Sequence, residues 1–152
     1  MFLDKLLPNV DLPYRGSRAA FWFLVLVTVT STVRSCVHLL APDGGAGSIA
    51  RIALDVAGGT NIVAVFSQWG ASQLVLACVQ WAVVLRYRFL VPAMLALIAL
   101  EQLLRFAAGQ IKPLQVESAP PGAYGTYIVF FLALVFLRLS LRQEQKQRQP
   151  LV

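Results

Sequence analysis

Four long runs of apolar residues dominate the chain, and short polar or Gly- and Pro-rich stretches separate them. Each run matches the ~20 residues that a helix needs to cross a bilayer. Transmembrane strands would be ~10 residues long with strict alternation of apolar and polar positions, so runs of this length predict helices. We therefore expect one all-α domain over residues 1–152, an integral-membrane four-helix bundle. The predicted spans are 19–41, 62–85, 89–109 and 123–141.

The polar stretches between the runs predict the borders of this bundle. In the first loop, apolar and polar residues recur at helical spacing over 48–57, which predicts a short interfacial helix capped by Ser48. Residues 1–17 mix apolar and charged positions with two prolines, so either a segment lying on the membrane surface or a loosely ordered tail fits them. Residues 142–152 are polar and basic, and they predict a solvated tail.

Composition and charge support a membrane protein and indicate its topology. Apolar residues make up 58% of the chain and charged residues only 13%, about half the charged fraction of an ordinary soluble domain. The net charge is +6, but the basic residues are not interleaved with exposed aromatics on a polar face, so nucleic acid is not an expected partner. Cytoplasmic loops of membrane proteins are enriched in Lys and Arg.

The basic residues of the tails, loops and helix ends are divided unequally between the two sides of the membrane. One side has only Arg51 and Lys112, whereas nine basic residues lie on the side of the chain ends and the 86–88 turn. This distribution predicts that both termini are cytoplasmic. The nine are Lys5, Arg15, Arg18, Arg86, Arg88, Arg138, Arg142, Lys146 and Arg148.

Several polar side chains interrupt the predicted spans. An ionisable group at membrane depth is costly, so each is a candidate for a functional site. A rise of 1.5 Å per residue puts Arg34, Glu101 and Arg105 about 24, 19 and 25 Å from the cytoplasmic ends of their helices. Gln68 lies about 12 Å below the outer end of its helix, so these groups share the outer third of the membrane. The candidate ligand-binding residues are Arg34, His38, Gln68, Gln73, Glu101, Gln102 and Arg105.

One carboxylate meets two arginines in this layer. Glu101 and Arg105 are four residues apart with the acid first, which favours an ion pair on one helix face. Arg34 must then reach outward to the interface, contact water or meet an anion. Three interpretations stay open: Glu101 bridges both arginines and locks two helices together, the cluster binds an anion or a lipid headgroup, or it serves catalysis or proton relay.

The sequence favours a non-enzymatic protein. His38 could shuttle protons near neutral pH, although a single histidine at the end of a span is also typical of an interface residue. No Ser-His-Asp or Cys-His set is suggested, because every aspartate lies outside the spans. His38, Glu101 and Cys36 are too few to propose a metal site, and no cofactor is specified.

Several short motifs carry a resemblance to known proteins. They are Gly58-Gly59-x-Asn61, the Trp69-Gly70-x-x-Gln73-Leu74 run and the Arg86-Tyr87-Arg88-Phe89-Leu90-Val91-Pro92 turn, together with Glu101 and Arg105. Over residues 58–110 this pattern resembles small bacterial inner-membrane proteins with four helices, similar to DoxX proteins in size and layout. The resemblance implies a bacterial inner-membrane location with several spans and assigns no catalytic residue.

Three functional hypotheses follow. The first is a non-enzymatic membrane subunit or scaffold, whose partners are other membrane subunits or further copies of this chain. The alternative is a binding or carrier protein for an anionic lipid or amphiphile that uses the outer-leaflet cluster. A second alternative is a membrane enzyme or proton-coupled redox component with Glu101 and His38 as acid and base groups.

Overall fold

The protein is built from four long helices. The computed structural model describes residues 7–8, 10, 12–116 and 120–148. The chain is all-α within these residues, and four of its helices are long and apolar enough to cross a membrane. This confirms the predicted all-α class with four helices of membrane-spanning length and composition. The helices are α2 (Arg18–Leu40), α3 (Gly59–Leu85), α4 (Val91–Ile111) and α5 (Pro121–Arg148), with a 3-10 turn, η1 (Arg88–Leu90), before α4.

Glycine and proline explain most of the helix ends. Helix α2 ends at Leu40, and Ala41 takes an extended conformation before Pro42, which restricts the residue ahead of it. Helix α3 begins at Gly59, three residues before the predicted start, because Gly58 has a positive φ of 90° and turns the chain into the helix. Helix α5 begins at Pro121, a residue whose fixed φ suits a first helical position, and it continues to Arg148, past the predicted end of its span.

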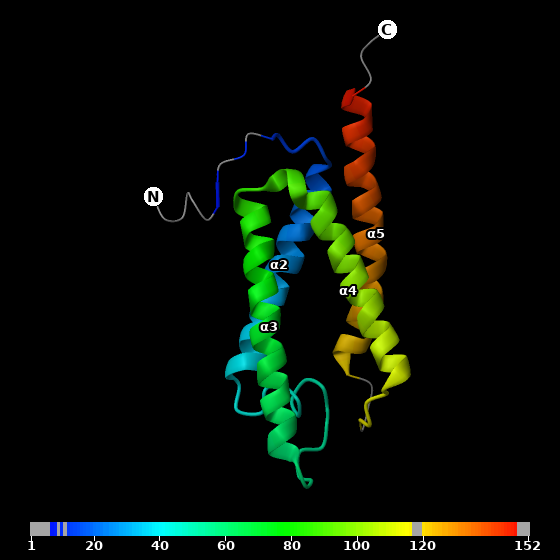
Figure 1. Cartoon of the computed structure of the whole chain (residues 1–152). Coiled ribbons are helices and arrows are strands. Elements are labelled where there is room, and N and C mark those ends of the chain that lie inside the picture. Colours follow the sequence, from blue (N-terminus) through cyan, green and yellow to red (C-terminus); the bar gives the residue numbers. More distant parts are fainter. Residues whose placement is uncertain (1–6, 9, 11, 117–119, 149–152) are drawn as a thin grey trace.

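The helices form two antiparallel hairpins, α2 with α3 and α4 with α5. Figure 1 shows that the hairpins converge where α2 begins and separate toward the end where α2 stops. Contacts within each hairpin far exceed those between the hairpins. We call the end where the hairpins meet the closed end and the opposite end the open end.

Apolar packing joins the two hairpins at the closed end. Leu24 of α2 and Val91 and Leu95 of α4 are fully buried, and Ala133 of α5 packs with them. The rings of Phe23 and Phe136 stack with centroids 4.5 Å apart. Lipid tails are as apolar as these side chains, so in a membrane close packing holds the helices together more than removal of apolar surface from water.

Residues before α2 form hydrogen bonds that stabilise the closed end. The Tyr14 hydroxyl donates to the Ser17 carbonyl oxygen at 2.9 Å and shares a 3.0 Å hydrogen bond with the Ser140 hydroxyl of α5. Burial raises the pKa of Tyr14, while the bond to Ser140 opposes this, so the phenol stays neutral. Tyr87 donates to the carbonyl oxygen of Pro8 at 2.8 Å. The described part of 1–17 thus contacts both hairpins, while residues 1–6, 9 and 11 lie outside the described residues.

The loop between α2 and α3 differs from the prediction. The structure describes 48–57 throughout and shows turns, bends and irregular backbone there instead of the predicted interfacial helix. Ser48 does not cap a helix; its backbone N–H donates to the Asp43 carboxylate at 2.7 Å. Arg51 has a φ of 58°, which is incompatible with a right-handed helix. The amphipathic spacing was therefore overridden by the acceptor at Asp43 and by the left-handed residue at Arg51.

A single glycine lets α3 approach α2 closely near the open end. A Cβ added at Gly70 would lie 2.7 Å from the Cβ of His38 and 2.8 Å from the backbone nitrogen of Leu39. Ser67, one turn away, donates to the Leu39 carbonyl oxygen at 3.0 Å. The backbones therefore touch at this point, which is typical of small residues at membrane helix crossings.

We predict that Gly70→Ala destabilises the α2–α3 hairpin by about 1–3 kcal/mol, because the added methyl group meets backbone rather than a flexible side-chain end. Thermal unfolding in detergent measures the effect. Gly125→Ala is the matched control, since a Cβ at Gly125 of α5 meets nothing within 4 Å. Equal melting temperatures for the two variants would contradict the close approach at Gly70.

Candidate functional site

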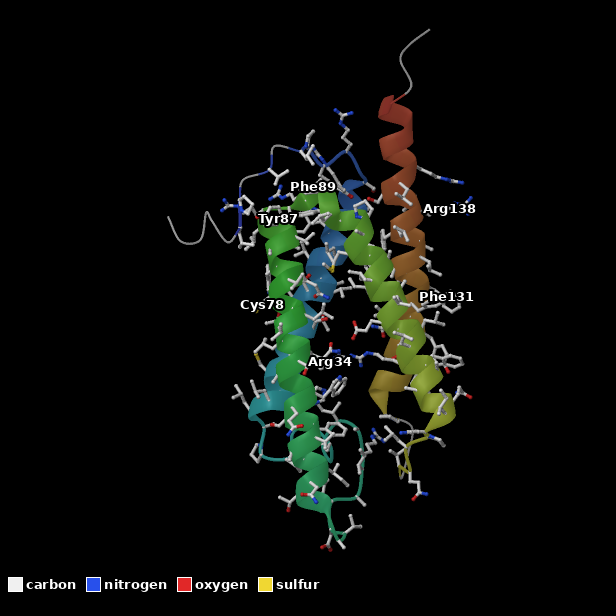
Figure 2. The ribbon with its side chains drawn as sticks, in the orientation of Figure 1. Arg34, Cys78, Tyr87, Phe89, Phe131 and Arg138 are labelled. Atoms are coloured by element: carbon white, nitrogen blue, oxygen red, sulfur yellow. The ribbon has the colours of Figure 1, made fainter. Side chains whose placement is uncertain are left out.

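Two arginines from different hairpins meet at one tryptophan near the open end. The guanidinium carbon of Arg34 in α2 lies 5.5 Å from the ring centroid of Trp69 in α3. The guanidinium carbon of Arg105 in α4 lies 4.9 Å from the same centroid. Figure 2 shows Arg34 in the space between the two hairpins. The structure thus brings the arginines of the predicted layer together around Trp69.

Arg105 has its carboxylate partner on its own helix. Its Nε and Nη2 atoms donate to Oε1 of Glu101 at 3.0 and 2.7 Å. Each of the two side chains is 22% exposed, so the pair is shielded from water without being sealed. The spacing of four residues with the acid first forms this pair inside α4, as the sequence predicts.

Arg34 makes no hydrogen bond or salt bridge within the part of the chain that the structure describes, although it is half buried. Its charge acts electrostatically on both Arg105 and Glu101. Among the described residues, both hydrogen bonds to the Glu101 carboxylate come from Arg105. Glu101 therefore does not bridge the two arginines in this structure. The three side chains carry a formal charge of +1, and the cation left over is Arg34.

Trp69 is the member of this cluster that sequence reasoning missed. Stacking of a guanidinium on Trp contributes about 0.5–2 kcal/mol, depending on how far water is excluded. A signal for Trp69 was present, because it lies ~24 Å along α3 from the closed end, at the same height as Arg34 in α2. It was left out because the candidate site was assembled from ionisable and amide side chains, and an indole is neither.

His38 anchors the neighbouring loop. It is buried, and its Nδ1 lies 2.7 Å from the Gly44 carbonyl oxygen, so Nδ1 carries the proton and donates it. Its ring lies against Trp69, with centroids 4.7 Å apart, and against Phe66 at 5.7 Å. His38 therefore belongs to the wall behind Trp69, and these contacts give it a packing role.

The three candidate glutamines lie in different places. Gln73 is half buried and follows Trp69 by four residues, about 40° round α3, so it shares the face of Trp69 one turn nearer the closed end. Gln68 is exposed and lies about 100° round the helix from Trp69. Gln102 is buried about 60° round α4 from Arg105, and it lines a cavity of about 210 Å³ with Phe130 and other residues of α5. Gln73 thus shares a helix face with Trp69, whereas Gln68 does not.

A groove between α3 and α4 opens beside Trp69 and Arg105. Its volume is about 600 Å³. A second, more apolar groove of about 370 Å³ shares the side chain of Leu114 with it and continues along the first turns of α3. We call the first cavity the α3–α4 groove. It is lined by Trp69, Arg105, Ala108, Gly109, Ile111, Lys112 and Leu114.

The described residues offer little for metal or nucleophilic chemistry. Among them, no three His, Cys, Asp or Glu side chains lie close enough to hold a metal ion. Cys36 is half buried, Cys78 is exposed, and both are free thiols. The cluster presents positive charge and an aromatic ring in a space from which water is partly excluded.

Comparison with protein-family models, with curated proteins and with solved structures finds no match to the chain. The resemblance to bacterial four-helix membrane proteins therefore rests on layout alone. Of that layout, the structure confirms the four long apolar helices.

Asp43 shapes the loop that receives His38. Its carboxylate accepts the backbone N–H groups of Gly45 at 2.9 Å and Ser48 at 2.7 Å. Hydrogen bonds from the Ser48 and Gly45 backbones lower the pKa of Asp43 from 3.8 to about 2. A depressed pKa means that the carboxylate stabilises the loop fully above pH 3.8 and loses this effect as the pH falls through about 2.

We predict that Asp43→Ala raises amide hydrogen exchange at Gly45 and Ser48 by about five- to tenfold, because two charge-assisted hydrogen bonds are lost. Hydrogen exchange with mass spectrometry at pH 6 measures this effect. Asp55→Ala, at an exposed carboxylate of the same loop, is the control and should leave the exchange unchanged. In the wild type, protection should fall between pH 3.8 and about 2; a loss already at pH 5 would show that Asp43 is not the acceptor.

Proposed function

We propose that the protein binds the anionic headgroup of a membrane amphiphile at the open end, with Arg34 as the principal cation. The observation that carries this proposal is the half-buried Arg34 guanidinium, which has no carboxylate partner among the described residues. A desolvated charge without a counter-ion costs several kcal/mol. Stacking on Trp69 offsets only part of that cost, and an anion would offset most of the rest.

The surroundings of the cluster favour an amphiphile over a small hydrophilic anion. The α3–α4 groove combines Arg105 and Lys112 with the apolar walls of Ile111 and Leu114. The adjoining groove adds Ile62 and Val65 to this apolar surface. A molecule with one charged group and an attached apolar part fits this pairing of polar and apolar surface.

The side of the membrane follows from the basic residues of the chain. Because most Lys and Arg residues of the tails, loops and helix ends lie at the closed end, we place that end and both termini in the cytoplasm. The open end then lies in the outer leaflet of an inner membrane, and the amphiphile enters sideways from that leaflet.

We predict that Arg34→Gln lowers the retention of anionic lipid at least about tenfold, because a charge-assisted hydrogen bond of about 1.5–3 kcal/mol is lost. Native mass spectrometry of protein extracted from bilayers of phosphatidylcholine and phosphatidylglycerol measures bound lipid directly. The matched control is Arg138→Gln, since Arg138 is exposed and points away from the bundle on α5 in Figure 2. Equal lipid content in Arg34→Gln and the control would refute the headgroup site.

The second proposal is that the protein is a subunit of a larger membrane assembly. The observation that favours it is the length of α5, which continues to Arg148 and projects beyond the other helices at the closed end (Figure 1). A short projecting helix is marginal in water by itself, so a partner that holds it would explain its helical form.

We predict that truncation after Leu141 releases this partner. In mild detergent, native mass spectrometry of the full chain should show an additional subunit or further copies of the chain, and the truncated chain should run as a monomer. The truncation leaves intact the core around Leu24 and the bond of Tyr14 to Ser140. A full-length protein that is already a clean monomer would count against the assembly.

A further inference from the structure

From the charges around Trp69 we infer that the site selects a headgroup with a single negative charge, such as a phosphodiester, over a phosphomonoester dianion. This inference rests on the proposed headgroup site and adds the charge class of its ligand.

The cluster can compensate one negative charge. Arg34 and Arg105 contribute two positive charges and Glu101 one negative charge, which leaves a formal charge of +1. Because Arg105 already gives both Nε and Nη2 to Glu101, Arg34 is the cation with its donors uncommitted among the described residues. A second negative charge on the headgroup would be left without a counter-ion beside the Glu101 carboxylate, which would repel it.

Lys112 does not change this balance. It also lines the α3–α4 groove, but it is exposed and follows the last residue of α4, seven residues or about 10 Å beyond Arg105 along the helix. Water and salt screen an exposed charge over about 8 Å at physiological ionic strength. Lys112 thus attracts anions to the mouth of the groove without neutralising a charge beside Arg34.

The test offers the protein two anionic lipids that differ in charge. Bilayers contain phosphatidylcholine with equal amounts of phosphatidylglycerol, a phosphodiester, and phosphatidic acid, a phosphomonoester. At pH 8 the monoester carries nearly two charges, since the second pKa of such groups is about 6. The lipid retained by the extracted protein is then counted by native mass spectrometry.

Wild type should retain more phosphatidylglycerol than phosphatidic acid. Glu101→Gln raises the site charge to +2 and should shift the ratio toward phosphatidic acid by about fivefold. This is the effect expected from removing one partly exposed negative charge. The double variant Glu101→Gln with Arg105→Gln restores a charge of +1 and should restore the wild-type ratio. Because this restoration depends on charge, it distinguishes charge selection from damage to the fold.

Each other outcome has a defined meaning. A wild type that prefers phosphatidic acid, or a ratio that Glu101→Gln leaves unchanged, overturns the charge assignment while the headgroup site stands. Retention of neither anionic lipid above phosphatidylcholine overturns the proposed function itself. Displacement of phosphatidylglycerol by millimolar inorganic phosphate would show that the site takes a free anion, and this also overturns the lipid assignment.

Discussion

The cost of a guanidinium group at membrane depth is the constraint on which this structure depends. The two arginines meet that cost differently. Arg105 is compensated by Glu101 one turn before it on α4, with Nε–Oε1 and Nη2–Oε1 distances of 3.0 and 2.7 Å. Arg34 has only the face of Trp69 among the described residues. Figure 2 shows Arg34 between the two hairpins, and Trp69, on which it stacks, lines the α3–α4 groove.

The packing elsewhere explains how the two hairpins are held. Leu24, Leu95 and their neighbours join the hairpins at the closed end, and the bond between Tyr14 and Ser140 fastens the same end. Within the first hairpin, Gly70 brings α3 against the α2 backbone at His38. Trp69 lies next to Gly70, about 100° round the helix, so the same close approach places its ring beside Arg34. The two hairpins are therefore held together at the closed end, and the arginine side chains lie toward the open end.

Helix lengths and heights were predictable from the sequence, whereas side-chain neighbours were only partly so. A run of ~20 apolar residues has one solution in a bilayer, and a rise of 1.5 Å per residue puts Arg34 and Arg105 at nearly equal heights. The prediction of a helix over 48–57 was wrong because Asp43 and Arg51 impose a local backbone geometry that the spacing of apolar residues does not encode. Height along a helix does not say which neighbour a side chain faces, so the cavity that Gln102 shares with α5 was not predictable in this way.

The pairing of Glu101 within its own helix explains why Arg34 is left over. An ion pair four residues apart needs no second helix, so it can form before the hairpins meet. A bridge from Glu101 to Arg34 would have tied α2 to α4 and closed the open end. For folding alone, an apolar residue in place of a buried charge is often neutral or stabilising. Bundle stability therefore does not explain a half-buried cation at Arg34 without a carboxylate partner among the described residues, and the proposed ligand would supply its counter-ion.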